Sequence, residues 1–93
     1  MPGSNYEVEY ALVEIPANTK LGRHYHPGMV FGYLLEGDYT LAIDGQAPKS
    51  FKPGETVRIE PDVVHDEWSG SVPAKFLSVF ILEKGKPLAV PVP

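Results

Sequence analysis

Near the end of its first third the chain reads GRHYHPG over residues 22–28, with His24 and His26 two residues apart. If this segment is extended, both imidazoles point to one side, because strand side chains alternate with a period of two. The third and last histidine, His65, closes the stretch PDVVH at residues 61–65. Neutral imidazole is a ligand for Zn, Cu, Fe and Ni, so the three histidines predict a metal site. The alternative is that they cap turns or lie half-exposed.

Apolar and polar residues alternate around these histidines, as is typical of β-strands. The clearest case is YEVEYALVEI at residues 6–15, whose even-numbered residues are expected on one face. Further strands are predicted at residues 31–35, 39–43, 49–52, 56–59, 63–68 and 75–82. No segment keeps an apolar period of 3.6 residues long enough for a helix. Short strands at this spacing predict an all-β sandwich or barrel.

Length and composition indicate a single domain over residues 1–93, with 43% hydrophobic and 22% charged residues. A net charge of −4 without a basic run argues against a nucleic-acid partner. No apolar run reaches the ~20 residues needed to cross a bilayer, and the polar residues 1–5 do not resemble a signal peptide. The absence of cysteine excludes disulfides and thiolate ligands. We expect a cytoplasmic protein that pairs with a second copy to cover a sheet edge.

The histidine pair lies in a recognisable motif. The chain resembles the cupin family, whose first motif has the form G-x5-H-x-H-x3,4-E-x6-G. His24 and His26 match the paired histidines and Gly37 matches the closing glycine, which places motif 1 at about residues 18–37. Asn18 stands at the first glycine position. Asparagine tolerates a left-handed backbone better than most residues, so this departure is expected to be mild.

The second cupin motif, G-x5-P-x-G-x2-H-x3-N, covers about residues 54–69. Gly54 and His65 match it, while Asp62 takes the second glycine position and Ser69 the asparagine position. The proline comes one place late. Two motifs in this order and separation imply a small cupin, with one all-β domain in the form of a jelly-roll β-barrel.

The resemblance fails at one position of chemical importance. Where the family has a metal-binding glutamate, this chain has Val30. The prediction is therefore a three-histidine site that leaves more positions on the ion for water or substrate. The remaining acidic candidates, Glu36, Glu60, Asp66 and Glu67, are expected to be mostly solvated.

Strand phase predicts the residues that line the cavity. If the histidines point inward, Val30, Gly32 and Leu34 point inward on the following strand, and Met29 forms a wall beside the site. Gly32 either opens space near the metal or relieves crowding where strands bend. The apolar run at residues 76–81 is predicted to be a strand buried on both faces, in the barrel wall or in a dimer contact.

Two functions remain open at this stage. Similar three-histidine sites in cupin dioxygenases bind Fe(II), so the resemblance implies a metal-dependent oxygenase, with lyase or isomerase chemistry as other enzyme classes. The alternative is a non-enzymatic module that binds or senses a small molecule. The expected cofactor is a divalent ion of Fe, Mn, Zn, Ni or Cu. The expected partners are a small molecule in the barrel cavity and a second copy in a homodimer.

Overall fold

The computed structural model describes residues 5–93, so most of the polar segment at residues 1–5 lies outside the described part. Within residues 5–93 the chain forms strands connected by turns and no helix. The strands are β1 (Tyr6–Ile15), β2 (His24–Tyr25), β3 (Gly28–Glu36), β4 (Tyr39–Ile43), β5 (Lys49–Phe51), β6 (Thr56–Ile59), β7 (His65–Ser69), β8 (Ala74–Glu83) and β9 (Val90–Pro91). The prediction of an all-β fold is confirmed. This part of the chain accordingly offers no helix that could span a lipid bilayer.

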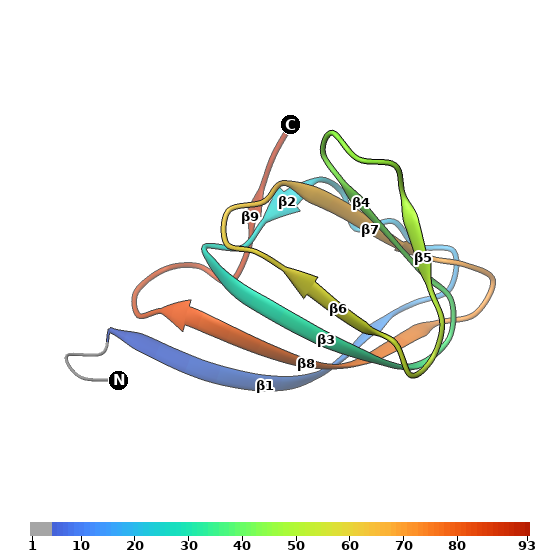
Figure 1. Ribbon diagram of the computed structural model, residues 1–93, viewed down its shortest axis with the longest axis horizontal. Coiled ribbons are helices and arrows are strands. Elements are labelled where there is room, and N and C mark those ends of the chain that lie inside the picture. The colour runs from blue at the N-terminus through green and yellow to red at the C-terminus, as the bar shows by residue number, and fades with distance from the viewer. Residues whose placement is uncertain (1–4) are drawn as a thin grey trace.

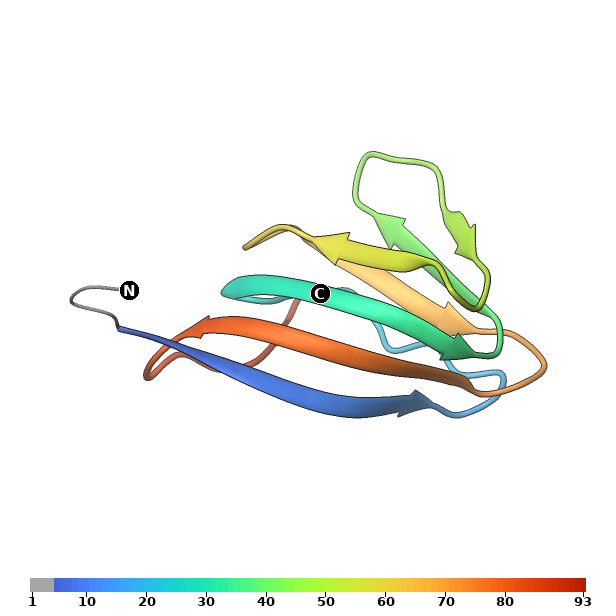
Figure 2. The ribbon, with the colours of Figure 1, turned by 60° about the horizontal axis from the view of Figure 1, so that its bottom comes forward.

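The strands form two antiparallel sheets that lie over one another as two layers (Figure 1). One has the order β1-β8-β3-β6 and the other the order β5-β4-β7-β2-β9. No strand pairing joins the two sheets within residues 5–93, so the prediction of a closed barrel is wrong. The tilted view in Figure 2 shows the two layers and the turns that carry the chain between them. Between β5 and β6 the chain passes from one sheet to the other. Pro53 has no backbone N–H to donate and Gly54 has a φ of +93°, so the hydrogen-bond ladder of β5 ends and the chain turns.

Most predicted strands are present, with shifted ends. β3 begins three residues earlier than predicted, at Gly28, and β7 begins at His65, two residues later than predicted. The short strands β2 and β9 were not among the predicted set. β9 lies at the edge of its sheet, where a proline-rich segment is tolerated because missing donors do not interrupt a ladder.

The hydrophobic core lies between the two sheets and draws side chains from both. It comprises Ile15, Val30, Leu34, Tyr39, Leu41, Val57, Ile59, Ala74, Phe76, Phe80 and Leu82. Along β8 the burial alternates, with even-numbered residues buried and odd-numbered residues at least partly exposed. The prediction that this strand is buried on both faces is therefore wrong, because β8 belongs to a sheet with only one covered face.

All four motif positions where the family prefers glycine have positive φ. The angles are 54° at Asn18, 97° at Gly37, 93° at Gly54 and 64° at Asp62. Asn18 and Asp62 are the only non-glycine residues with positive φ in residues 5–93. The prediction that asparagine and aspartate would be tolerated there is confirmed, since both adopt this conformation at low cost.

Candidate metal centre

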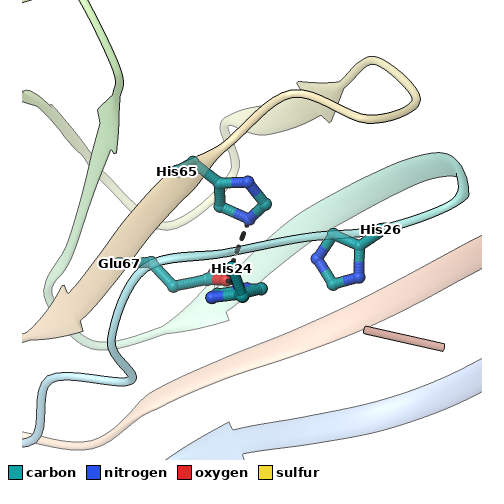
Figure 3. Close-up of side chains that lie close together, drawn as sticks. All are labelled: His24, His26, His65 and Glu67. Atoms are coloured by element: carbon teal, nitrogen blue, oxygen red, sulfur yellow. Dashed lines mark ion pairs between the residues drawn. The ribbon is translucent and has the colours of Figure 1, made fainter. Parts of the chain in front are cut away.

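The histidine pair and the distant His65 meet between the sheets. His24 on β2 and His65 on β7 are direct cross-strand partners, and His26 follows β2. The ring centroids lie 4.3 Å apart for His24 and His65, 5.0 Å for His24 and His26, and 5.1 Å for His26 and His65. The structure thus brings together every residue of the predicted metal set, as Figure 3 shows.

A carboxylate that the sequence analysis placed in solvent joins this cluster. Glu67 lies two residues after His65 on β7, so both side chains point to the same face. One ligand atom from each of the three histidines and Glu67 lies within 4.8 Å of the others. The Glu67 side chain is only 13% exposed, so the prediction that it is solvated is wrong. The signal was present as a His-x-Glu spacing, which obeys the same period as His-x-His.

Each imidazole is fixed by a hydrogen bond on its far side. The Nδ1 atoms of His24, His26 and His65 donate to the backbone carbonyl oxygens of Gly22 at 2.6 Å, Leu88 at 2.9 Å and Val63 at 2.9 Å. A carbonyl oxygen only accepts, so the proton lies on Nδ1 and the lone pair on Nε2. This orientation and tautomer are what protein metal sites impose on histidine ligands.

The Nε2 atoms face a carboxylate at close range. Oε2 of Glu67 lies 3.0 Å from Nε2 of His24 and 3.4 Å from Nε2 of His65. A lone pair and a carboxylate oxygen repel each other unless a proton or a cation lies between them. Within residues 5–93, Nε2 of His65 is the one buried side-chain nitrogen or oxygen without a hydrogen-bond partner. A divalent cation bound by these atoms would satisfy both observations.

The electrostatics of the cluster favour an ionised carboxylate. Burial raises the pKa of Glu67, but the close approach of the His24 and His65 rings and the hydrogen bond from Tyr39 outweigh it and hold the pKa below the ordinary value. The hydrogen bond to Glu67 raises the pKa of His24 above its usual range, although burial opposes it. Burial lowers the pKa of His26, which favours the neutral, metal-binding form.

Tyr39 on β4 orients the carboxylate. Its hydroxyl donates to Oε1 of Glu67 at 2.8 Å, which leaves Oε2 directed at the histidines. Burial raises the pKa of Tyr39, so the phenol stays protonated and remains a donor. Tyr39 was assigned to a strand by the sequence but not to the site, because nothing local indicates which residue of a neighbouring strand faces Glu67.

Asp66 is also buried, although it was expected to be solvated. Its carboxylate fixes the loop that leads to His24. Its Oδ1 accepts the backbone N–H of Gly22 at 2.9 Å and that of Glu67 at 2.7 Å. Its Oδ2 lies 3.5 Å from Nζ of Lys20. These contacts point away from the histidines. Asp66 is therefore a structural carboxylate rather than a ligand.

Glu36 and Glu60 are exposed, as predicted, and neither lies in the cluster. Glu36 forms an ion pair with Lys75 at 3.3 Å, and Glu60 forms one with Arg58 at 3.0 Å.

A cavity of about 250 Å³ opens beside the cluster. It is lined by Val13, Ile15, Leu21, His24, His26, Val30, Gly32, Tyr39, Val57, Ile59, Glu67, Phe76, Ser78, Phe80, Leu88 and Ala89. Of the four pocket residues expected from strand phase, Val30 and Gly32 line this cavity. Leu34 points inward but is fully buried in the core, and Met29 alternates with buried Gly28 and Val30, so it lies on the outer face of its sheet. The expected roles of Leu34 and Met29 in the cavity wall are therefore wrong.

The C-terminal segment completes the site. The carbonyl oxygen of Leu88 accepts the hydrogen bond that holds His26. Further along, β9 pairs with β2, and the backbone N–H of Val92 donates to the carbonyl oxygen of Arg23 at 3.0 Å. Leu88 also lines the cavity while 44% exposed, which places it at the mouth. No local sequence signal linked this proline-rich tail to the histidines.

Two packed antiparallel sheets that enclose a histidine and carboxylate cluster define a β-sandwich able to hold a metal ion. The family model for the cupin domain matches residues 11–80, so the chain belongs to the cupin family. No curated protein sequence matched the chain.

Several solved structures share the fold at low identity. The DMSP lyase DddQ from Ruegeria pomeroyi DSS-3 is 20% identical with a TM-score of 0.80, covering 91% of this chain and 43% of that one. A cupin-like protein from Thermotoga maritima is 20% identical with a TM-score of 0.74, covering 95% of this chain and 65% of that one. An oxalate decarboxylase from Lactobacillus farciminis is 22% identical with a TM-score of 0.74, covering 91% and 26%. This chain thus spans less than half the length of the lyase.

Proposed function

We propose that this cupin binds a divalent transition metal and acts as a metal-dependent enzyme on a small molecule held in the cavity. The ligands would be Nε2 of His24, His26 and His65 and the carboxylate of Glu67. The observation that carries the proposal is the set of three Nδ1–carbonyl hydrogen bonds, which leave three Nε2 lone pairs free in a cluster whose ligand atoms lie within 4.8 Å of one another.

The residues present fit such an ion. Three imidazoles and a carboxylate suit Fe, Mn, Zn, Ni or Cu. Glu67 on β7 supplies the negative charge that the family motif places on β3, at the position of Val30. Four protein ligands still leave open positions on a six-coordinate ion, where a substrate and a second reactant could bind.

When bound, the ion would supply Lewis-acid polarisation and open coordination positions. The chain's own residues have separate tasks. Tyr39 keeps its proton and holds Glu67 in place through Oε1, while the largely apolar lining around the cluster excludes water. Low local polarity strengthens every charge interaction inside the site.

The reaction class is the finer part of the proposal. We place an Fe(II) oxygenase first and lyase or isomerase chemistry second. The similar solved structures include a DMSP lyase and an oxalate decarboxylase, and at 20–22% identity they share only the fold with this chain. A fold of this kind carries several chemistries, so the residues of the site must decide.

The metal proposal is tested by titrating metal-free protein with Mn(II), Fe(II), Ni(II) and Zn(II) by calorimetry, with elemental analysis of the product. His26→Ala and Glu67→Gln should each lower affinity by at least the roughly 10-fold to 100-fold that loss of a ligand's hydrogen-bond partner costs. Glu60→Gln removes an exposed carboxylate and is the matched control. Wild-type protein that binds none of these ions would refute the proposal.

A second assay separates the enzyme from the binding module. Fe(II)-loaded protein is screened aerobically against thiols, β-diketones and enol-type acids with an oxygen electrode, and anaerobically by NMR. Oxygen uptake absent from His26→Ala supports the oxygenase, and anaerobic turnover supports a lyase or isomerase. If no compound is consumed and ligands shift the melting temperature equally with and without metal, the non-enzymatic alternative is correct.

A further inference from the structure

The cavity beside the metal centre has a composition that limits what it can hold. Resting on the proposed metal function, we propose that its ligand is a small molecule with one monoanionic, metal-chelating head and an uncharged, apolar body. Two observations carry this inference: the charge of the cluster and the shape and lining of the cavity.

The charge of the cluster favours a monoanion. Three neutral imidazoles, one ionised carboxylate and a divalent ion together carry a single positive charge. One anionic head group neutralises that charge in a buried site. Within the described residues no lysine or arginine lines the cavity, so a second anionic group would be buried without a partner at a large cost.

The shape of the cavity comes from small residues that lie side by side. Gly32 on β3 and Ser78 on β8 are cross-strand partners, and both line the cavity. A Cβ atom at Gly32 would lie 3.3 Å from Cδ1 of Phe76 and 3.9 Å from Cβ of Val57. A side chain at Gly32 would therefore have to displace the Phe76 ring, which also lines the cavity, so Gly32 relieves crowding here and a larger residue would change the shape of the hollow.

The size of the cavity restricts the ligand further. A volume of about 250 Å³ equals roughly eight water molecules at liquid density. Its lining includes buried aliphatic side chains such as Ile15 and Ile59, and two exposed ones, Leu21 and Leu88, which are 49% and 44% exposed. A ligand would enter past two leucines with its apolar body against aliphatic walls. Apart from the cluster and Tyr39, Ser78 offers the one polar side chain in this lining.

The test uses hydroxamates, which chelate metals as monoanions, and Ni(II)-loaded full-length protein. Affinity is measured by calorimetry for acetohydroxamate, butanohydroxamate, hexanohydroxamate and the carboxylate-terminated succinyl monohydroxamate. Affinity should rise about fourfold per added methylene until the cavity is full. The carboxylate-terminated compound should bind no more tightly than acetohydroxamate.

Variants assign the effect to the cavity. Gly32→Ala and Val57→Ile reduce the space and should weaken hexanohydroxamate binding while leaving acetohydroxamate binding and Ni(II) affinity unchanged. Ser78→Ala is the matched control, because it changes the same hollow without filling it. If one space-filling variant fails to fold, as judged by circular dichroism, the other still decides.

The outcomes separate this inference from the function on which it rests. Protein that takes up Ni(II) but binds the charged compound as tightly as hexanohydroxamate refutes the ligand class alone. Equal affinity along the alkyl series also refutes it. Protein that binds no Ni(II) refutes both the metal function and this inference.

A second inference rests on a different surface. The outer side of the four-stranded sheet carries a grid of nine apolar side chains from β1, β8 and β3, here called the outer face. Its cross-strand rows are Val8–Ile81–Met29, Tyr10–Val79–Phe31 and Leu12–Leu77–Tyr33. We propose that the outer face binds the same face of a second copy, so that the protein is a homodimer.

The exposed area of the outer face fits this occupant. Leu12 is 79% exposed, Tyr10 74% and Val8 50%. With about 150–250 Å² for each large side chain, the nine residues leave roughly 700–900 Å² in contact with solvent. A stable interface buries about 800 Å² per partner, whereas the largest apolar patch of a monomer is typically about 300–600 Å².

The charged residues at one end of the outer face form ion pairs within one chain. Lys75 lies 3.7 Å from Glu14 and 3.3 Å from Glu36, so this group carries one net negative charge. A two-fold contact would therefore bring together apolar centres surrounded by a polar rim, as in self-complementary interfaces. The contact would cover a sheet face, in place of the sheet edge expected from the sequence.

Sedimentation velocity tests the dimer. Wild-type protein at about 100 µM, above the micromolar Kd of weak interfaces of this size, should sediment as a dimer. The double variant Tyr10→Thr/Leu12→Thr should be monomeric with unchanged metal content. Val72→Thr removes an apolar residue that is 46% exposed in a loop outside the outer face, and this variant should stay dimeric. A monomeric wild type, or a double variant that remains dimeric, refutes this interface.

Discussion

At the scale of single residues, the cluster has its carboxylate at a different position from the one that the family motif gives. Val30 occupies the position where the family motif has glutamate, and it lines the cavity. Glu67 provides a carboxylate from a different strand, directed at the same histidines. The motif positions alone give three candidate ligands, and the folded chain brings a fourth beside them. Distance in space, and not motif position, determines the donor set.

The hydrogen bond from Tyr39 to Glu67 should contribute to metal affinity. Tyr39→Phe removes the donor at 2.8 Å without changing the ring. We expect about a tenfold loss of metal affinity and a loss of about 1–3 kcal/mol in stability of the metal-free protein. Calorimetric titration and urea denaturation measure both. Tyr33→Phe, on an exposed tyrosine, should change neither, and an equal effect of the two variants would contradict the role of Tyr39.

Metal binding should weaken as the pH falls, because only neutral imidazole binds a metal and free histidine has a pKa of about 6.5. The pKa of Glu67 lies below its ordinary value, so its carboxylate stays ionised in mild acid and the loss comes from the histidines. The metal-induced rise in melting temperature should therefore shrink between about pH 7 and about pH 5. A rise that persists undiminished at about pH 4 would contradict histidine ligation.

The metal-free protein should show the opposite trend for one interaction. Glu67 raises the pKa of His24, so the protonated ring stabilises the folded state. This contribution is full below the unfolded-state pKa and is lost as the pH rises through the raised folded-state pKa. The difference in melting temperature between metal-free wild type and His24→Gln should therefore decrease as the pH rises past that point. A difference that grows would contradict the pairing.

At the scale of the strands, the period-two rule explains what the sequence could and could not predict. It placed the paired histidines together and predicted that Gly32 points inward, and applied to His65 it would also have found Glu67. It could not find Tyr39 or Leu88, because contacts across strands depend on register. Register is set by the whole sheet and leaves no mark on a single segment.

The hydrogen bonds that Asp66 accepts from two backbone N–H groups give a prediction at the scale of the strands. Asp66→Asn keeps an oxygen that can accept the N–H groups of Gly22 and Glu67, whereas Asp66→Ala leaves both donors without it. We expect Ala to cost about 1–3 kcal/mol of stability in the metal-free protein and Asn clearly less. Urea denaturation gives both values. Equal losses would show that the negative charge, and not the acceptor, is what matters.

At the scale of the whole molecule, the sequence predicted an all-β domain correctly but predicted a closed barrel where the structure has two separate sheets. Alternation and turn residues indicate strands, and the motif glycine positions mark turns that the structure reproduces at Asn18 and Asp62. Closure of a barrel depends on whether edge strands of the two sheets meet. In residues 5–93 they do not, so the sandwich is held together by the side chains between its layers.

Two neighbouring leucines on β3 test this account of the core. Leu34 is fully buried between the sheets, while Leu35 is 42% exposed on the opposite side. Leu34→Ala should cost about 2–5 kcal/mol of stability, since it removes packing and leaves a cavity. Leu35→Ala should cost much less. Comparable losses in chemical denaturation would mean that the outer side is as well packed as the core.

The contact between His26 and the C-terminal segment has a consequence for the order of events during synthesis. The Leu88 carbonyl that fixes the His26 ring lies 62 residues further along the chain. His26 therefore acquires its acceptor only after nearly the whole domain has left the ribosome. Until then the ring is free to rotate, and a chain that stops before Leu88 keeps all three histidines yet holds one of them without its anchor. The histidine cluster is thus among the last parts of the fold to be completed.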